Sequence, residues 1–189
     1  MNLSNKEGAL LLKLARQSIK SKFDNNENAL LNLKQSASKT ILEENRGAFV
    51  TLHINKQLRG CIGNIEPVKT IFASVEDNAK KAAFHDPRFK ALSYEELDEI
   101  DIDISILTKP LKLEYDDAND LIVKLKPEID GVIIRKNNYG ATFLPQVWKQ
   151  LNSAKLFLSH LCMKAGLSSD EWETGELDVF LYQVQMFEE

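Results

Sequence analysis

The strict alternation of residues 101–106 is the feature that most constrains the fold of this chain. The isoleucines at positions 102, 104 and 106 are separated by Asp101, Asp103 and Ser105. Because neighbouring side chains of a β-strand point to opposite faces, this pattern predicts a strand over residues 101–113 with one buried and one polar face.

Helical and strand patterns follow one another irregularly along the rest of the chain. Amphipathic helices are predicted at residues 4–23 and 28–34, then strands within 47–63, a helix that begins at Pro67 and ends near His85, a hairpin at 131–144 and a final strand at 179–187. This order predicts an α+β fold with a mixed, largely antiparallel sheet flanked by helices. We expect a single domain over residues 1–189, with a small N-terminal helical lobe over about residues 1–45 packed on the main part.

Charge and cysteine usage exclude several classes of function. The net charge is -4 and the pI is near 5.5, so we expect no nucleic-acid partner and no binding to an anionic membrane surface. The two cysteines, Cys61 and Cys162, form no C-x-x-C pair, which favours a reducing compartment. No segment has the ~20 apolar residues that a membrane span needs. We therefore expect a cytoplasmic protein.

Residues 58–63 (LRGCIG) carry the strongest chemical signal. Glycines at positions 60 and 63 allow close approach of another group to the backbone, and the cation of Arg59 favours the thiolate form of Cys61. The functional interpretation is a thiolate held by Arg59, acting as a nucleophile or as part of an anion site. The alternative is a half-buried cysteine at a strand end, with Arg59 paired to a carboxylate.

The alternation in residues 47–63 predicts a hairpin with a three-residue loop at 55–57. In that register Thr51 lies opposite Cys61 and His53 lies opposite Arg59, so these four side chains share one face. His53 and Cys61 would then be diagonal neighbours, roughly 7–8 Å apart between backbones.

Two further segments contain candidate site residues. In residues 85–89 (HDPRF), Asp86 could orient a histidine or hold Arg59, and Arg88 could bind an anionic group through two hydrogen bonds. In residues 143–146 (FLPQ), Gln146 would lie in a first helical turn. The alternatives are a helix stop with a local ion pair and an ordinary strand-to-helix corner.

Motifs for cofactors and metals are absent from the sequence. We find no glycine-rich phosphate loop and no dinucleotide fingerprint, and His53, His85 and His160 are not at metal-ligand spacing with one another. Cys162 lies on the apolar stripe of a predicted helix, which indicates a core position. We therefore expect no cofactor and no bound metal.

Several segments together resemble a known family. Residues 47–52 leading into 58–63, and then residues 82–83, 86–89, 130–131, 143–146 and 164–167, resemble the AMMECR domain family over nearly the whole chain. The form is similar to the prokaryotic members called AmmeMemoRadiSam system protein A, which are encoded beside a MEMO-like protein and a radical SAM protein. The resemblance implies a single domain with an α/β main part and a smaller lobe, and it implies no particular reaction.

The residues of this chain that match the family pattern are Arg59, Gly60, Cys61, Gly63, Asp86, Arg88 and Gln146. His53 and His85 are not fixed parts of that pattern, which weakens the case for a Cys-His catalytic pair.

Two hypotheses of function follow. The first is an enzyme or enzyme subunit with a cleft for a small anionic or modified substrate, working with MEMO-like and radical SAM proteins. Its catalytic residues would be Cys61, Arg59 and Asp86, and its binding residues would be Gly60, Gly63, Arg88, Gln146, Thr51 and His53. The second is a non-catalytic adaptor domain that uses the same cleft for a protein partner. The sequence leaves open whether the protein is an enzyme.

Overall fold

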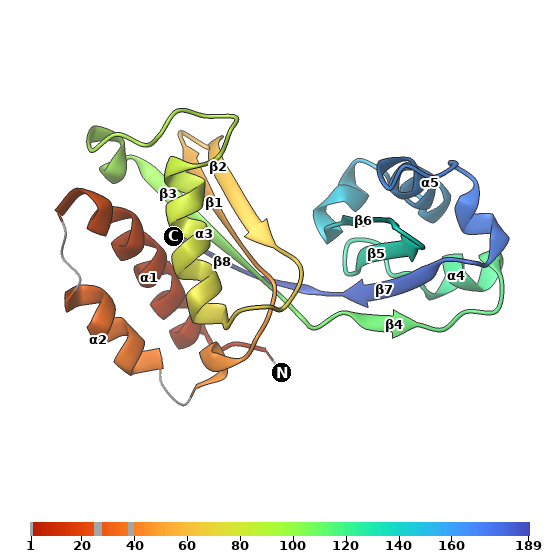
Figure 1. The fold of residues 1–189 in the computed structure, drawn as a ribbon, viewed down its shortest axis with the longest axis horizontal. Coiled ribbons are helices and arrows are strands. Elements are labelled where there is room, and N and C mark those ends of the chain that lie inside the picture. Colours follow the sequence, from red (N-terminus) through yellow and green to blue (C-terminus); the bar gives the residue numbers. More distant parts are fainter. Residues whose placement is uncertain (1, 25–27, 38–39) are drawn as a thin grey trace. The chain divides into compact units, whose positions relative to one another are not determined.

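The computed structural model describes residues 2–24, 28–37 and 40–189 (Figure 1). The chain divides into two compact units, each with a four-stranded sheet of its own. Unit 1 comprises Met1–Leu107 and Gln185–Glu189, and unit 2 comprises Thr108–Val184. The expectation of one domain with a lobe at about residues 1–45 stays a prediction.

Unit 1 combines a sheet in the order β2-β1-β3-β8 with three α-helices. Its elements are α1 (Asn5–Asp24), α2 (Asn28–Ala37), η1 (Ile41–Glu43), β1 (Ala48–Ile54), β2 (Gln57–Asn64), α3 (Ile71–Phe84), η2 (Glu95–Asp98), β3 (Ile100–Leu107) and β8 (Val184–Glu188). Strand β1 pairs antiparallel with both β2 and β3. Strand β2 is therefore one edge of this sheet.

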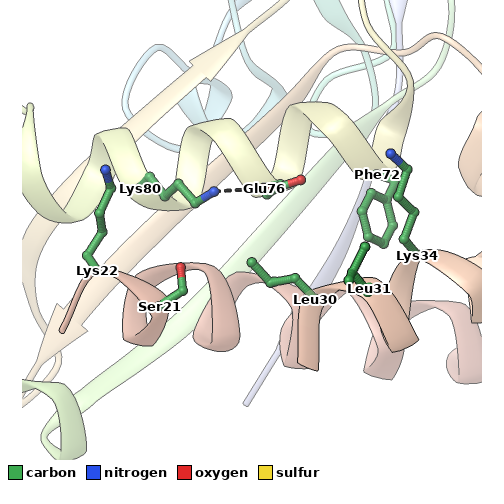
Figure 2. A pocket seen from close by; sticks show the side chains of 8 residues that line it. All are labelled: Ser21, Lys22, Leu30, Leu31, Lys34, Phe72, Glu76 and Lys80. Atoms are coloured by element: carbon green, nitrogen blue, oxygen red, sulfur yellow. Dashed lines mark hydrogen bonds and ion pairs between the residues drawn. The ribbon is translucent and has the colours of Figure 1, made fainter. Parts of the chain in front are cut away.

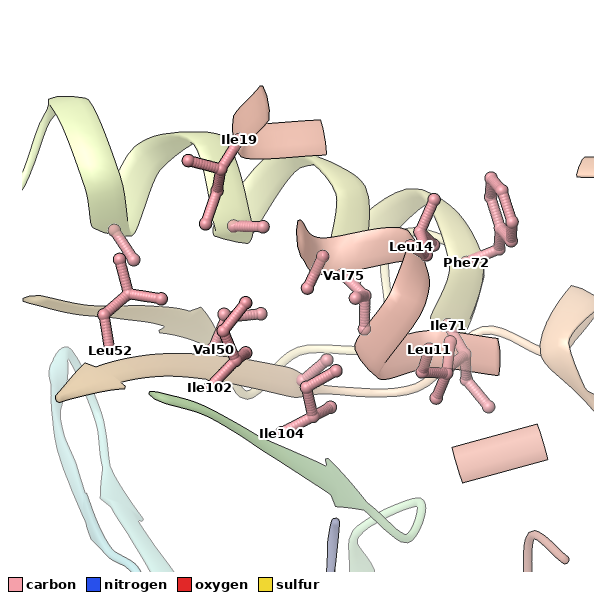
Figure 3. Packing of buried hydrophobic residues seen from close by; sticks show 14 of the residues in the cluster. Leu11, Leu14, Ile19, Val50, Leu52, Ile71, Phe72, Val75, Ile102 and Ile104 are labelled. Atoms are coloured by element: carbon pink, nitrogen blue, oxygen red, sulfur yellow. The ribbon is translucent and has the colours of Figure 1, made fainter. Parts of the chain in front are cut away.

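Helices α1 and α3 cover one face of that sheet (Figure 3). Leu11 and Leu14 of α1 are fully buried, as are Val75 of α3 and the inward residues of β1 and β3, among them Val50, Leu52, Ile102 and Ile104. Asp101 is exposed, and Asp103 and Ser105 are partly exposed. The predicted alternation of β3 is confirmed, and the opposite face of the sheet is polar.

Helix α3 begins later than the sequence indicated. Pro67 lies outside it, and the helix begins at Ile71 after the N-cap Thr70, whose hydroxyl accepts a hydrogen bond from the Ala73 amide. An N-cap hydroxyl stabilises the start of a helix because it accepts a hydrogen bond from a free amide of the first turn. Proline is compatible with the first turn but provides no such hydrogen bond. The predicted end near His85, just before Pro87, is confirmed.

The β1–β2 hairpin has a tighter turn than expected. Ile54 pairs with Gln57, so the loop contains only Asn55 and Lys56, both with positive φ (52° and 64°). Two residues in this conformation match the twist of a hairpin better than a three-residue loop would. A register shift between Leu52 and His53 then adds one residue to β2, so the predicted opposition of Thr51 and Cys61 is nevertheless found. The predicted opposition of His53 and Arg59 is wrong, because the tighter turn places His53 opposite Leu58.

Unit 2 has a sheet in the order β4-β7-β5-β6. Its elements are β4 (Leu111–Leu113), α4 (Ala118–Lys124), β5 (Gly131–Lys136), β6 (Tyr139–Phe143), η3 (Pro145–Lys149), α5 (Ala154–Lys164), η4 (Glu171–Thr174) and β7 (Asp178–Tyr182). Trp148 and Phe157 stack in its core with ring centroids 3.8 Å apart. This second core is built from residues of unit 2 alone.

Two segments predicted as single strands are each divided between the two sheets. Residues 101–113 form β3 and β4, and residues 179–187 form β7 and β8. At these points Thr108 donates its amide to Gln183, and Gln183 donates its amide to the Thr108 hydroxyl, both at 2.9 Å. Because Pro110 has no N–H to donate, the first strand cannot continue uninterrupted. The α+β class is confirmed, with its strands in two sheets.

No helix in the described ranges is both long enough and apolar enough to cross a membrane.

Candidate functional site

Cys61 lies in β2 on the polar face of the unit 1 sheet, opposite Thr51 of β1. The Thr51 hydroxyl donates a hydrogen bond to the Cys61 sulfur at 3.1 Å. The cysteine is partly exposed. The predicted hairpin face therefore brings these two candidate residues into direct contact.

The outer edge of β2 at Cys61 is bound by two side chains in place of a further strand. The Cys61 amide donates to Asp86 Oδ2 at 2.8 Å, and Arg88 Nη2 donates to the Cys61 carbonyl at 3.3 Å. We call this Asp86–Arg88 pair the edge clamp. An open strand edge invites pairing with another chain, and the clamp satisfies that edge while it fixes the cysteine backbone.

Asp86 is held as a carboxylate by four donors. Arg88 provides its Nε at 3.0 Å, its Nη2 at 2.7 Å and its backbone amide at 3.0 Å, and the Cys61 amide is the fourth. The Arg88 guanidinium is the main reason why the pKa of Asp86 lies well below its usual range. Burial opposes that shift, and the two backbone amides reinforce it. A carboxylate this firmly ionised does not carry protons at neutral pH, so its contacts favour a positioning role.

Arg59 is paired with a carboxylate, which agrees with the alternative interpretation of residues 58–63. Its Nε and Nη2 donate to the two carboxylate oxygens of Glu96 in η2 at 2.8 and 2.9 Å. Hydrogen bonding to Glu96 raises the pKa of Arg59, and burial acts in the opposite direction. Among the described residues, the Arg59 side chain donates its hydrogen bonds to Glu96 and none to the Cys61 sulfur. Its assignment as a site residue stays a prediction.

His53 and Asp103 form a second pair on the same polar face. His53 Nδ1 lies 3.2 Å from Asp103 Oδ2, and Asp103 lies opposite Thr51 across β1 and β3. Burial raises the pKa of Asp103, and the charge of His53 acts in the opposite direction. Cys61, Thr51 and Asp103 thus form one row across three strands, with His53 in the next row. We call these four residues the polar-face cluster.

The two glycines beside Cys61 are fully used by packing within unit 1. A Cβ added to Gly60 would lie 2.2 Å from the Ala82 carbonyl oxygen, because α3 packs directly on β2. A Cβ added to Gly63 would lie 2.2 Å from the ring of Phe49. The predicted close approach is present at both positions, and within the described chain the groups that approach are a helix and an aromatic ring.

The remaining predicted residues lie in unit 2. Gln146 is in η3, whereas the edge clamp and the polar-face cluster are built from unit 1 alone. Cys162 is fully buried in α5, and burial raises the pKa of its thiol to about 11. Its predicted core position is confirmed.

Sequence reasoning missed Glu96 and Asp103 as partners in this region. The polar side of the 101–106 alternation pointed toward Asp103, but only the strand order places it beside Thr51. Within the described ranges, no group of three or more His, Cys, Asp or Glu side chains is arranged to hold a metal ion.

The fold and site define an α+β protein with two antiparallel sheets and a partly exposed cysteine held at a sheet edge by an Asp–Arg pair. Residues 12–187 match the AMMECR1 family, and the chain belongs to that family. Protein MK0488 of Methanopyrus kandleri is 35% identical, and the match covers 99% of this chain and 90% of the relative. A protein of Methanothermobacter thermautotrophicus is 37% identical, with 99% and 96% covered.

A solved structure has the same fold. The crystal structure of uncharacterized protein PH0010 from Pyrococcus horikoshii matches with a TM-score of 0.78 at 31% sequence identity. The match covers 99% of this chain and 93% of that chain.

Proposed function

We propose that the protein is an enzyme or enzyme subunit in which Cys61 is the reactive group and the polar-face cluster binds a small anionic or modified substrate. The observation that carries this proposal is the placement of a partly exposed thiol on the same sheet face as a histidine paired with a carboxylate. In the same proposal the protein works in the cytoplasm with MEMO-like and radical SAM proteins, as the family resemblance implies.

The His53–Asp103 contact supports a role in proton transfer. Asp103 contacts Nδ1, so Nε2 is the ring nitrogen available to accept a proton from the thiol or from a substrate. A cysteine needs such a base, or a nearby cation, to react as the thiolate. His53 lies two residues along β1 from Thr51, which is the partner of Cys61 on β2. Such diagonal neighbours are roughly 7–8 Å apart between backbones, so a substrate atom or one water molecule would complete the proton path.

Arg88 supports the choice of an anionic substrate. Its side chain is 54% exposed, and among the described residues its hydrogen bonds use only Nε and Nη2. Nη1 is therefore available to a carboxylate or phosphate group close to Cys61. The clamp would then position the cysteine and bind the substrate at once.

Alkylation with two reagents of different charge tests this proposal. Iodoacetate is anionic and iodoacetamide is neutral. An anion site beside Cys61 therefore raises the ratio of the iodoacetate rate to the iodoacetamide rate above the ratio measured for free cysteine. We expect this ratio to fall in Arg88→Gln, and we expect His53→Gln to slow both reactions at neutral pH. Intact-protein mass spectrometry measures each rate, with the buried Cys162 as internal control. A rate ratio equal to that of free cysteine in the wild-type protein would contradict the proposal.

A non-catalytic adaptor is the second candidate, and one observation favours it. Arg59 and Asp86, two of the three residues assigned to catalysis, already have intramolecular partners. In that case a complex with the MEMO-like or radical SAM protein would survive Cys61→Ser and be lost in Arg59→Ala. Co-purification with circular dichroism of each variant distinguishes the two candidates.

A further inference from the structure

Three helices of unit 1 enclose a groove that has no part in the site described above. The groove has a volume of about 410 Å³ and lies between α1, α2 and α3 (Figure 2). Leu30 and Leu31 of α2 and Phe72 of α3 supply its apolar surface. A second hollow of about 310 Å³ shares Lys34, Phe72 and Glu76 with it and continues along α2 and α3. Together they form one elongated surface, which we call the helical groove.

The rim of the helical groove carries more lysines than carboxylates, although the chain as a whole is acidic. Lys22, Lys34 and Lys80 line it from three different helices, as Figure 2 shows. Lys80 is paired with Glu76 at 2.7 Å. Among the described residues, Lys22 and Lys34 form no ion pair and no side-chain hydrogen bond. Two unpaired lysines therefore flank the apolar surface of the first hollow, while Glu43 lines the second, so the lining as a whole has three cations and two carboxylates on a protein of net charge -4.

The shape of the groove favours a polypeptide over an enclosed small molecule. Leu31 is 56% exposed, and Lys22 and Lys34 are also exposed, so an occupant would be covered from one side only. Small-molecule sites usually enclose most of their ligand, whereas helix-in-groove recognition leaves the far side of the bound helix in water. An occupant that packs on Leu30, Leu31 and Phe72 and places carboxylates near the lysines would match both the apolar surface and the charge of the rim.

We propose that the helical groove binds an acidic amphipathic helical segment of a partner protein. The segment would place aliphatic side chains on the apolar surface and glutamates or aspartates against Lys22 and Lys34. The groove lies on the helix-covered side of the unit 1 sheet, and the polar-face cluster lies on the opposite side. A docked segment therefore leaves Cys61 accessible, and the inference is independent of the proposed reaction.

Fluorescence anisotropy with a designed peptide tests the inference. The probe is a labelled peptide of about 16 residues with leucines at positions i, i+3, i+4 and i+7 and glutamates elsewhere. Its control is a permuted peptide of the same composition that has no continuous apolar face. We expect saturable binding of the first peptide, at least about tenfold tighter than the second, that weakens as salt rises above about 0.15 M.

Three variants of exposed residues locate the binding and leave the core intact. The double variant Lys22→Glu/Lys34→Glu reverses the charges of the two unpaired lysines of the rim, and Leu31→Asp removes the exposed apolar contact. The double variant Lys149→Glu/Lys155→Glu makes the same charge change at exposed positions of unit 2 and is the matched control. We expect about tenfold weaker binding in the first two and unchanged binding in the third.

Two results with the peptide would overturn the inference. One is the absence of saturable peptide binding up to about 1 mM. The other is equal binding by the wild-type protein and the Lys22→Glu/Lys34→Glu variant. Binding of phosphatidylserine vesicles without binding of the peptide would also reject a protein partner, and would assign the basic rim to a lipid surface.

Discussion

The two cysteines of this chain lie in contrasting environments, and the contrast shows what makes a thiol a candidate for chemistry. Cys61 is partly exposed on a polar sheet face, accepts a hydrogen bond from Thr51 and has its backbone fixed by the edge clamp. Cys162 is fully buried in the core of unit 2, where burial raises the pKa of its thiol to about 11. The two residues are chemically identical, and only Cys61 has both solvent exposure and polar neighbours.

The largest expected difference is in the rate of modification. Cys61 should react with a thiol reagent in the native protein, whereas Cys162 must wait for unit 2 to open, which lowers its rate by about 1000-fold or more. Timed labelling followed by peptide mass spectrometry gives both rates in one sample. Equal protection of the two thiols would remove the contrast on which the candidate site depends.

The next largest effect is expected where the backbone next to Cys61 contacts α3. Gly60→Ala would place a Cβ 2.2 Å from the Ala82 carbonyl, and we expect a loss of about 3 kcal/mol in the stability of unit 1. Hydrogen exchange of the β1–β2 amides measures it. Gly140→Ala in unit 2 is the control, because its Cβ would lie 3.2 Å from the nearest atom, and there we expect less than about 1 kcal/mol.

A smaller effect is expected in stability when each thiol is replaced by a hydroxyl. Cys162→Ser buries a hydroxyl in an apolar core and should destabilise unit 2 by about 2 kcal/mol, whereas Cys61→Ser should change stability by less than about 1 kcal/mol. Both tryptophans, Trp148 and Trp172, lie in unit 2, so urea unfolding followed by tryptophan fluorescence reports on Cys162→Ser, and hydrogen exchange of the β1–β2 amides reports on Cys61→Ser in unit 1. A larger loss in Cys61→Ser than in Cys162→Ser would reverse the comparison.

The smallest expected effect is the pH dependence contributed by the edge clamp. Because the folded-state pKa of Asp86 is lowered, its stabilisation is fully present above the unfolded value of about 4 and is lost as the pH falls toward the folded value. The difference in unfolding free energy between wild type and Asp86→Asn should therefore shrink by about 1 kcal/mol from pH 6 to pH 3. A difference that stays constant over this range would show that Asp86 is not held as a carboxylate.

Much of the fold was predictable from local patterns. The alternation at residues 101–106, the end of α3 before Pro87 and the opposition of Thr51 and Cys61 all follow from side-chain periodicity and proline geometry. The Thr51–Cys61 pairing was correct although the turn was not. A three-residue loop and a two-residue turn followed by a one-residue bulge in β2 give the same pairing from Leu52 onward. The alternation of side chains beyond the turn therefore cannot distinguish the two arrangements.

The rest depended on information that a single strand does not contain. Residues 101–113 and 179–187 both continue a strand pattern from one sheet into the other. Pro110 marks an interruption in the first segment but not a change of sheet, and the second segment contains no such residue. The Glu96 partner of Arg59 and the Asp103 partner of His53 come from segments far along the chain. Their contacts depend on the register and order of the strands, which the sequence alone did not establish.

The position of β8 has a consequence for the order of folding. Unit 2 is one continuous segment, whereas unit 1 needs residues 185–189 to place β8 beside β3. During synthesis the inserted unit can become native first, while the sheet that carries Cys61 still has an unpaired margin along β3. Residues 185–189 must therefore leave the ribosome before the sheet that carries Cys61 can be completed.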